Sequence, residues 1–157
     1  MAREILFKAK RIDNGEWVMG GSIIQFLDDG VRSFYMPQFN EKCICKHDEV
    51  TDDILEFQNT RFYKVDGATI CQYTGLTDKN GNKIWENDVC VCKKRGCAFF
   101  GCVVKWNQVK ARFDVNAMSF DFPMTLEECI DGISINGLDY EVIGNIFDKP
   151  ELLRGCR

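Results

Sequence analysis

Long hydrophobic runs are missing from this chain of 157 residues. The longest apolar stretches, such as 23–27, which is itself interrupted by Gln25, fall far short of the ~20 residues that a membrane span requires. The opening residues, MAREILFKAKR, contain no apolar segment of the kind found in secretory signal peptides. We therefore expect no membrane partner and a protein that stays in the cytoplasm.

Histidine is nearly absent, because His47 is the only one. Nucleophilic catalysis by a thiol needs a nearby base, and a single histidine gives little support for such a pair. Neighbouring carboxylates all fall at predicted turns or caps: Glu86 and Asp88, Asp52 and Asp53, Glu127 and Glu128. The glycines at 20–21 and 96–101 lack the spacing and the Lys-Ser/Thr end of a phosphate-binding loop. We therefore expect a protein that is not an enzyme and holds no cofactor.

An excess of positive charge is also lacking, since 24 acidic residues outnumber 20 basic ones and the net charge is −4. Nucleic-acid binders neutralise phosphates with clustered Lys and Arg, so this balance argues against a general one. Basic residues near aromatic rings are nevertheless weak candidates for binding a ligand or single-stranded nucleic acid: Lys93, Lys94, Arg95, Lys105, Trp106, Lys110 and Arg112. The simpler interpretation places them at solvated strand ends and in loops.

Cysteine, by contrast, is frequent for a chain of this length, with nine residues. Their odd number and the missing export signal favour free thiols, which pack as small hydrophobic side chains. Cys43, Cys45 and His47 are the best metal candidates, because residues i, i+2 and i+4 of a strand share one face. Zinc sites usually use Cys-x2–4-Cys pairs instead, so zinc is possible but not expected. The competing interpretation is that Cys90 and Cys92 pack inside a sheet.

Alternating apolar and polar residues, separated by turn residues, predict a mainly β fold. Strands are expected at 4–12, 16–19, 23–27, 31–36, 61–65, 68–73, 83–85, 89–92, 99–106, 110–115, 118–122 and 140–147. The length fits one domain, or two intimate subdomains of about 1–66 and 67–157.

Local signals add a hairpin and a helix to this pattern. Asn80-Gly81 predicts a type I′ turn, which requires positive φ at both residues. Thr125 and Glu128 have the spacing of a capping box and predict a helix that runs to about Asp131. Residues 38–60 are the least patterned, with an edge strand predicted at 42–50 and a helical turn at 52–57.

Three blocks of sequence carry a family resemblance. They are a charged and apolar strand at 3–10, the segment QYTGLTDKNGNKIWENDV at 72–89, and EVIGNIFDKPELL at 141–153. In this order they resemble the YopX family of phage and prophage proteins. The family usually has glycine where this chain has Asn87, and residues 26–62 match no recognisable block.

The resemblance implies a β-rich protein of viral origin in a bacterial host cell. We expect an antiparallel meander plus a small half-open β-barrel, with one or two short helices near the C-terminus. The family motif assigns structural roles to Tyr73, Gly75, Asn80, Gly81, Trp85, Asp88 and Gly144. The expected function is non-enzymatic binding of a host protein or a small host signalling molecule by a homo-oligomer. The alternative is a nucleic-acid-binding module of phage origin.

Overall fold

The computed structural model describes residues 4–28, 30–47, 54–94, 97–117, 124–135 and 138–155. Its contacts divide the chain into two compact units. The N-terminal unit is Leu6–Ile70, and the C-terminal unit is Cys71–Arg157 together with Met1–Ile5. The two units are described separately below.

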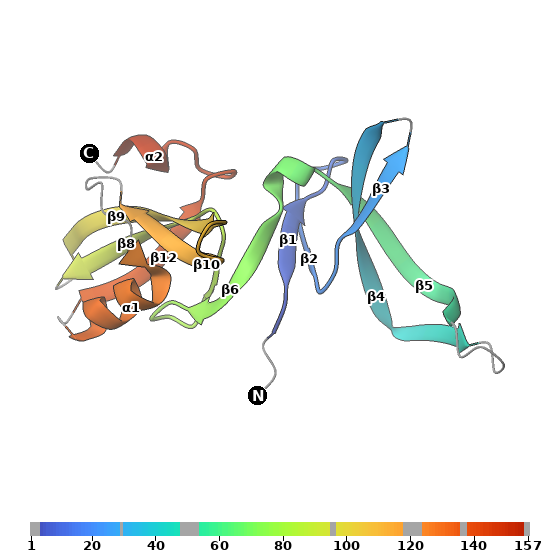
Figure 1. Ribbon diagram of the computed structural model, residues 1–157, viewed down its shortest axis with the longest axis horizontal. Coiled ribbons are helices and arrows are strands. Elements are labelled where there is room, and N and C mark those ends of the chain that lie inside the picture. Colours follow the sequence, from blue (N-terminus) through green and yellow to red (C-terminus); the bar gives the residue numbers. More distant parts are fainter. Residues whose placement is uncertain are drawn as a thin grey trace. The chain divides into compact units, whose positions relative to one another are not determined.

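The N-terminal unit is built from antiparallel strands (Figure 1). Its elements are β1 (Phe7–Lys10), β2 (Trp17–Gly20), β3 (Ile24–Asp28), β4 (Val31–His47), β5 (Ile54–Val65) and the 3-10 helix η1 (Gly67–Thr69). β1 pairs with β2, while β3, β4 and β5 form a three-stranded meander. Ala9, Val18, Met36 and Val65 are buried in the core of this unit.

The weakly patterned segment of the sequence is mostly strand in the structure. β4 continues through 42–47, so the predicted edge strand is part of a longer element. The helical turn predicted at 52–57 is wrong for Ile54–Phe57, which pair with β4 as the start of β5. Residues 48–53 lie outside the described part of the chain. Hydrogen bonds across a long hairpin determine this structure, and the side-chain pattern alone did not reveal them.

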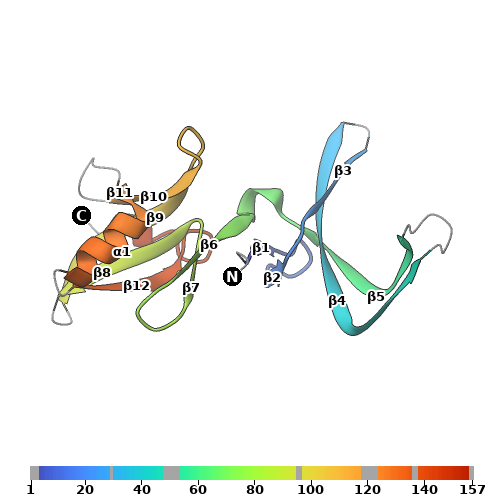
Figure 2. The same ribbon diagram turned by 60° about the horizontal axis from the view of Figure 1, so that its bottom comes forward.

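The C-terminal unit combines a larger sheet with a helix. Its elements are β6 (Cys71–Thr77), β7 (Lys83–Trp85), β8 (Asp88–Lys94), β9 (Cys97–Asn107), β10 (Arg112–Ala117), β11 (Met124–Thr125), α1 (Leu126–Ile135), β12 (Leu138–Asn145) and α2 (Leu152–Gly155). Five strands form an antiparallel sheet in the order β11-β10-β9-β8-β12, and α1 lies across one face of it (Figure 2). β6 pairs with β7 in a hairpin.

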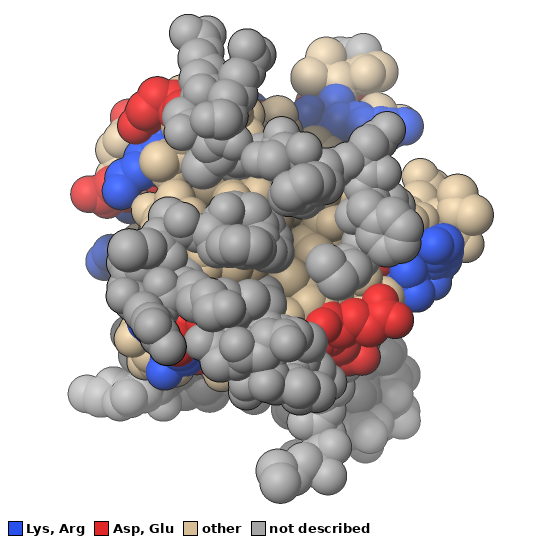
Figure 3. All heavy atoms as spheres, turned by 90° about the vertical axis from the view of Figure 1, so that its left-hand side faces the viewer, with Lys and Arg blue, Asp and Glu red and all other residues tan. Residues whose placement is uncertain are grey.

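Charges of both signs are mixed on the surface of the described residues. In the view of Figure 3, Lys and Arg atoms lie close to Asp and Glu atoms. An ion pair within the C-terminal unit follows the same pattern, because Lys79 Nζ is 3.0 Å from Asp139 Oδ2 and 3.6 Å from Glu141 Oε2. The described residues of this face therefore give a long polyanion no continuous basic track.

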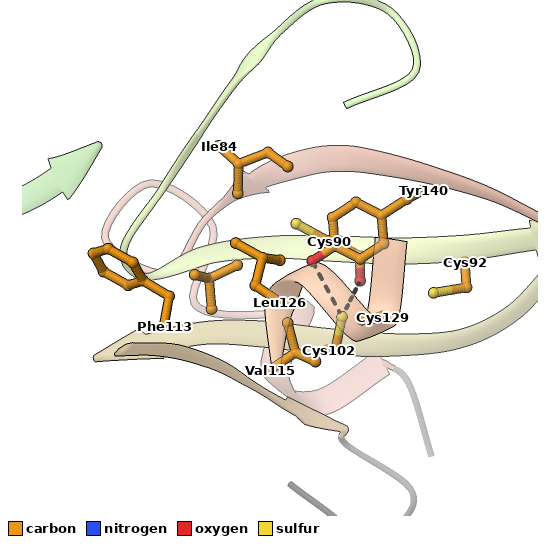
Figure 4. Close-up of a cluster of buried hydrophobic side chains, with 10 residues drawn as sticks. Ile84, Cys90, Cys92, Cys102, Phe113, Val115, Leu126, Cys129 and Tyr140 are labelled. Carbon is orange, nitrogen blue, oxygen red and sulfur yellow. Dashed lines mark hydrogen bonds between the residues drawn. The ribbon is translucent and has the colours of Figure 1, made fainter. Parts of the chain in front are cut away.

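Cysteines form much of the C-terminal core (Figure 4). Cys90, Cys92, Cys102 and Cys129 are all buried and free. The Cys102 thiol donates to the Cys90 carbonyl oxygen at 3.7 Å. Burial raises the pKa of the Cys90 thiol well above its ordinary value, which keeps that thiol neutral at pH 7. The prediction that cysteines of this sheet pack as small hydrophobic side chains is confirmed.

The β6–β7 hairpin has a different turn from the predicted one. Gly81 has a φ of +81°, but Asn80 is not among the residues with positive φ, so the type I′ prediction is wrong. Asp78 organises the loop instead: its Oδ1 accepts the backbone N–H groups of Asn80 and Asn82, both at 2.9 Å. A carboxylate that binds the loop backbone removes the need for two left-handed residues.

The predicted fold class is confirmed, since the chain is mainly β with antiparallel sheets and short helices near its C-terminus. The five-stranded sheet is open, with β11 and β12 at its two ends. α1 continues to Ile135, beyond the end predicted near Asp131, and Gly132 lies within it. The strand predicted at 118–122 lies outside the described residues. Within the described residues, no helix has both the length and the apolar character needed to cross a membrane.

Candidate functional site

Two adjoining cavities open on the C-terminal unit. They share five lining residues: Thr74, Leu76, Arg112, Phe113 and Glu127. The smaller cavity measures about 180 Å³ and adds Thr125 and Leu126. The larger measures about 370 Å³ and adds Gly75, Trp106 and Ala111. Because its walls come from β6, from the β9–β10 hairpin and from the start of α1, we call this site the β6–α1 groove.

The β6 wall contains a local irregularity at Gly75. The register between β6 and β7 shifts between Tyr73 and Thr77, and Gly75 within this interval has a φ of +91°. A Cβ at Gly75 would meet nothing within 4 Å, so the left-handed backbone and not crowding calls for glycine here. Thr74 Oγ1 donates to the Ile84 carbonyl oxygen at 2.8 Å and accepts the Leu76 N–H at 3.2 Å. The structural role predicted for Gly75 is therefore explained by its left-handed backbone conformation.

The β9–β10 wall presents an exposed tryptophan. Trp106 and Phe113 face each other across the two strands, with ring centroids 5.0 Å apart in an edge-to-face arrangement. Phe113 is 9% exposed, whereas Trp106 is 41% exposed. The turn that joins the strands includes Ala111, a non-glycine residue with a φ of +50°. Backbone strain of this kind concentrates at functional sites, and here it lies on the cavity wall.

Arg112 is held by a buried carboxylate. Its Nε donates to Asp114 Oδ1 at 2.8 Å, and the other oxygen of Asp114 accepts Asn107 Nδ2 at 2.7 Å. Asp114 is buried, while the Arg112 side chain is 40% exposed and lines both cavities. The terminal amino groups of Arg112 make no hydrogen bond to the described part of the chain. These donors are therefore oriented and available at the groove.

The helical wall begins with the predicted capping box. The Glu128 N–H donates to Thr125 Oγ1 at 3.0 Å, and Glu128 Oε2 accepts the Thr125 N–H at 3.1 Å. These contacts confirm the capping-box prediction, and the hydrogen bonds from Thr125 lower the pKa of Glu128 below its usual value. Glu127, the next residue toward the N-terminus, is exposed and lines the groove. The cap thus fixes the position of this wall.

The basic candidates from the sequence separate into two groups. Trp106 and Arg112 both line the groove, and Lys110 is exposed in the adjacent turn. Lys105 is directed elsewhere, because its Nζ donates to Asn87 Oδ1 at 2.5 Å.

Lys93 and Lys94 belong to the other end of the sheet. The backbone of Lys94 pairs with Cys97, which is about 30 Å from Trp106 along β9 at ~3.3 Å per residue. Arg95 lies outside the described residues. The structure therefore brings together Trp106, Lys110 and Arg112 but not the complete candidate set.

The metal candidates lie on β4. Cys43, Cys45 and His47 belong to this strand by their backbones, but their side chains lie outside the described part of the structure. The pairing of β4 with β5 shifts register between Phe39 and Ile44 and again between Lys46 and His47. These shifts interrupt the regular alternation on which the one-face argument depends. Among the described residues, no group of three or more His, Cys, Asp or Glu could hold a metal ion. Zinc binding at these three residues, possible but not expected from the sequence, is therefore not tested by the described residues.

Asn87, Asp88 and Asn145 of the sequence motif form a mostly buried polar cluster with two further residues. Asp88 Oδ2 accepts the Trp85 N–H at 2.9 Å, which confirms the turn-capping role expected of Asp88. Its Oδ1 accepts Asn145 Nδ2, also at 2.9 Å. Asn87 Nδ2 lies 3.6 Å from Cys71 Sγ, while its Oδ1 accepts Lys105. We call Cys71, Asn87, Asp88, Lys105 and Asn145 the polar cluster.

Two other motif positions have structural explanations. Tyr73 and Trp85 are buried and paired across the hairpin, with ring centroids 5.5 Å apart. Gly144 lies at a register shift of β12, and a Cβ there would come within 3.1 Å of Leu152 and Lys149 side-chain atoms. A larger residue at 144 would therefore push against the segment that leads into α2.

Sequence reasoning missed most wall residues of the groove, and Thr74, Leu76 and Glu127 illustrate why. Each belongs to a segment whose local role was recognised, namely the strand around Gly75 and the capping box. No local signal indicates that the two segments face the Trp106–Phe113 pair, since this depends on how α1 packs on the sheet. The cavity is a product of tertiary structure.

Comparison with known proteins adds a family and a fold. The family described as YopX protein matches residues 31–154. The chain belongs to the YopX family. The YopX match contains every residue of the groove and of the polar cluster, and it includes 31–62, for which no family block was recognisable. Asn87, where the family usually has glycine, has a φ of +65°, and asparagine tolerates this left-handed conformation better than most residues.

Solved structures extend the likeness beyond the matched range. The crystal structure of protein EF1440 from Enterococcus faecalis has a TM-score of 0.54 to this chain and is 24% identical. The similarity covers 97% of this chain and 99% of that one. At this level of identity the likeness concerns the fold. The curated proteins include no match.

Proposed function

We propose that this YopX-family protein is a phage or prophage accessory protein that acts in the cytoplasm of a bacterial host by binding a small molecule in the β6–α1 groove. The observation that carries the proposal is the convergence of exposed Trp106 and oriented Arg112 on one cavity of about 370 Å³. Small-molecule sites are typically concave, about 300–1,000 Å³ in volume, and mostly apolar with a few placed polar groups.

The composition of the walls supports this proposal. Leu76, Trp106 and Phe113 supply apolar and aromatic surface, while Arg112 and Glu127 supply one charge of each sign. Between a small host molecule and a host protein, the concave shape and modest volume of the groove favour the small molecule. A protein partner generally requires a contact surface of about 800 Å² on each side.

Binding without catalysis is the second part of the proposal. The hydroxyls of Thr74 and Thr125 are used in hydrogen bonds within the fold, and arginine keeps its charge in proteins. Glu127 is then the lining group with an ionisable carboxyl. Acid–base or nucleophilic chemistry commonly needs a second group within hydrogen-bond reach of the first. We therefore assign the groove to recognition.

The nucleic-acid alternative receives less support. Lys105 donates to Asn87 and is directed away from the groove, and the Lys93 end of the sheet is about 30 Å from Trp106. A single-stranded binder generally needs a basic groove that follows several phosphates. We therefore keep nucleic acid as a competitor in the experiments below.

Self-association is the third part of the proposal. Phe26, Leu27 and Val31 of the β3–β4 hairpin are more than half exposed. β3 pairs with β4 on one side and is an edge of the three-stranded sheet. Edge strands with apolar side chains readily pair with another chain, and identical edges pair symmetrically. We propose that β3 joins two copies of the protein.

Light scattering of the wild type and of Leu27→Lys tests this part. The wild type should have the mass of a dimer or larger oligomer, and the variant should have the mass of a monomer. The matched control is Val109→Lys, because Val109 is also exposed but lies in the β9–β10 turn. A monomeric wild type at about 100 μM would contradict self-association.

Native mass spectrometry of protein isolated from bacterial lysate tests the groove itself. Wild-type protein should retain a small molecule, and Arg112→Gln should lose it. Lys110→Gln removes a nearby exposed charge outside the groove lining and should retain it. The proposal fails if all three proteins carry the same bound mass, or if the retained species is an oligonucleotide.

A further inference from the structure

The exposed part of Trp106 points to the shape of the ligand. One side of the indole packs against the edge or face of Phe113, and the residue is still 41% exposed on the wall of the larger cavity. Ligand sites are concave and lined with aromatic side chains, so an exposed indole on a cavity wall offers surface that a ligand can cover. A flat aromatic ring covers an exposed indole with a favourable stacking geometry. The groove therefore suits a planar aromatic molecule.

Arg112 points to the charge of the ligand. Asp114 and Asn107 hold the guanidinium by its Nε, so the amino groups that project beyond this contact are positioned in advance. A guanidinium in a fixed orientation binds phosphate or carboxylate oxygens through parallel N–H donors. Asp114 already has two donors at its oxygens and does not line the cavity. An anionic group is therefore the best partner for the basic end of the groove.

Glu127 points to the polarity of the ring. It comes from α1, whereas Trp106 and Arg112 come from the β9–β10 hairpin. A carboxylate repels an anion but accepts hydrogen bonds from ring N–H or amino groups. The two charged side chains thus favour a ligand whose anionic end differs from its hydrogen-bonding aromatic end.

We propose that the ligand is a mononucleotide, with its base stacked on Trp106, its phosphate bound by Arg112 and its base edge near Glu127. This inference rests on the proposed small-molecule function and deepens it by naming the ligand class. A cavity of about 370 Å³ lies near the lower end of the ~300–1,000 Å³ range of small-molecule sites, which limits the ligand to about one nucleotide.

The test is calorimetric titration of the full-length protein with the 5′-monophosphates of guanosine, adenosine, cytidine and uridine. Guanosine, inorganic phosphate, L-tryptophan and a ten-nucleotide single-stranded DNA are the comparison ligands. At least one mononucleotide should bind ten or more times more tightly than guanosine and than phosphate. This pattern requires both the ring and the anion.

Variants locate the binding in the groove. Arg112→Gln and Trp106→Leu should each weaken mononucleotide binding at least tenfold, and Lys110→Gln should change it less than twofold. Circular dichroism and thermal unfolding identify any variant that fails to fold. The Arg112 side chain is half-exposed, so Arg112→Gln should fold. This variant keeps the test valid if Trp106→Leu is unstable.

The outcomes separate this inference from the function on which it rests. If L-tryptophan binds and the mononucleotides do not, the ligand class is wrong while small-molecule binding in the groove stands. Phosphate binding as tight as nucleotide binding also overturns the ligand class. Tighter binding of the single-stranded DNA overturns both proposals in favour of the nucleic-acid module. If no probe binds and native mass spectrometry finds no retained molecule, both proposals fail.

Discussion

Two neighbouring residues of β9 belong to different sites, the polar cluster and the β6–α1 groove. Lys105 extends into the polar cluster, where its Nζ donates to Asn87. Trp106 lies on the other face of the strand and forms a wall of the β6–α1 groove. In the polar cluster the side-chain groups are buried, apart from the half-buried Lys105, and are bonded to one another. In the groove the aromatic and charged groups are partly exposed.

The difference between the polar cluster and the groove separates stability from recognition. A buried polar group that loses its partner costs about 1–3 kcal/mol, so the polar cluster depends on each of its members. Partly exposed groove residues can be hydrated, and their replacement changes stability much less. Substitutions in the cluster should therefore lower the free energy of unfolding, and substitutions in the groove should remove ligand binding with little change in stability.

The largest expected effect is that of Asp88→Ala in the polar cluster. It removes the acceptor of two buried donors, the Trp85 N–H and Asn145 Nδ2. We expect a loss of about 3 kcal/mol in the free energy of unfolding, measured by urea denaturation. Asp88→Asn keeps one oxygen and should lose less. A loss below about 1 kcal/mol for Asp88→Ala would show that the cluster is less coupled than the comparison requires.

The next effect concerns Asp78, which holds the β6–β7 loop beside β6. Burial alone would raise the pKa of Asp78, but hydrogen bonds from Asn82, Val142 and Asn80 lower it below its usual value. Asp78→Ala should cost about 2 kcal/mol at pH 7, since carboxylate hydrogen bonds are stronger than neutral ones.

The pH dependence of the Asp78 effect follows from the direction of the shift. A carboxyl whose pKa is lower in the folded state stabilises that state above the unfolded pKa of about 3.9. This stabilisation is lost as the pH falls through the lower folded value. The stability difference between wild type and Asp78→Ala should thus be constant from pH 7 to about pH 5 and shrink below pH 4. A difference that persists unchanged at pH 2 would contradict this explanation.

Asn87 allows backbone and side-chain effects to be separated. Asn87→Ala loses the side-chain contacts to Lys105 and Cys71. It also places alanine, which has a Cβ but no side-chain group that could hydrogen-bond the backbone, at a φ of +65°. We therefore expect a loss of about 1–2 kcal/mol in the free energy of unfolding. Asn87→Gly loses the same contacts but relieves the backbone, so it should lie within about 1 kcal/mol of the wild type. Equal losses in the two variants would show that the side-chain contacts alone matter.

The smallest expected effect belongs to the groove. Ala111→Gly relieves a positive φ and should stabilise the protein by about 0.5–1 kcal/mol, measured by thermal unfolding. If the strained turn positions Trp106 and Arg112, the same variant should also weaken ligand binding. Destabilisation by Ala111→Gly would mean that the alanine side chain makes a contact that outweighs the strain.

Much of the fold could be predicted from local sequence signals. The Thr125–Glu128 capping box and the turn-capping Asp88 depend on residues within a few positions of each other, and both predictions are confirmed. The type I′ turn prediction was wrong because Asp78 stabilises another loop conformation. The helical turn predicted at 52–57 was wrong for Ile54–Phe57 because pairing in a long hairpin overrides weak local preferences.

The groove could be predicted only in part. The pattern of aromatic and basic residues selected Trp106 and Arg112, which both line the groove. It also grouped them with Lys105 and Lys93, which lie elsewhere in the structure. Spacing along a strand cannot show which cations are held by a hydrogen-bond partner, as Lys105 is by Asn87. Thr74 and Glu127 are 53 positions apart and meet at one cavity through packing alone.

The most direct measurement follows the three tryptophan indole N–H signals of ¹⁵N-labelled protein by NMR during addition of a small-molecule extract of bacterial cells. Trp85 is buried in the hairpin and Trp17 belongs to the N-terminal unit, so both serve as internal controls. We expect the Trp106 signal to shift while those of Trp17 and Trp85 stay in place, and Arg112→Gln to abolish the shift. A shift of Trp17 alone, or no shift of Trp106, would contradict the assignment of the groove as the binding site.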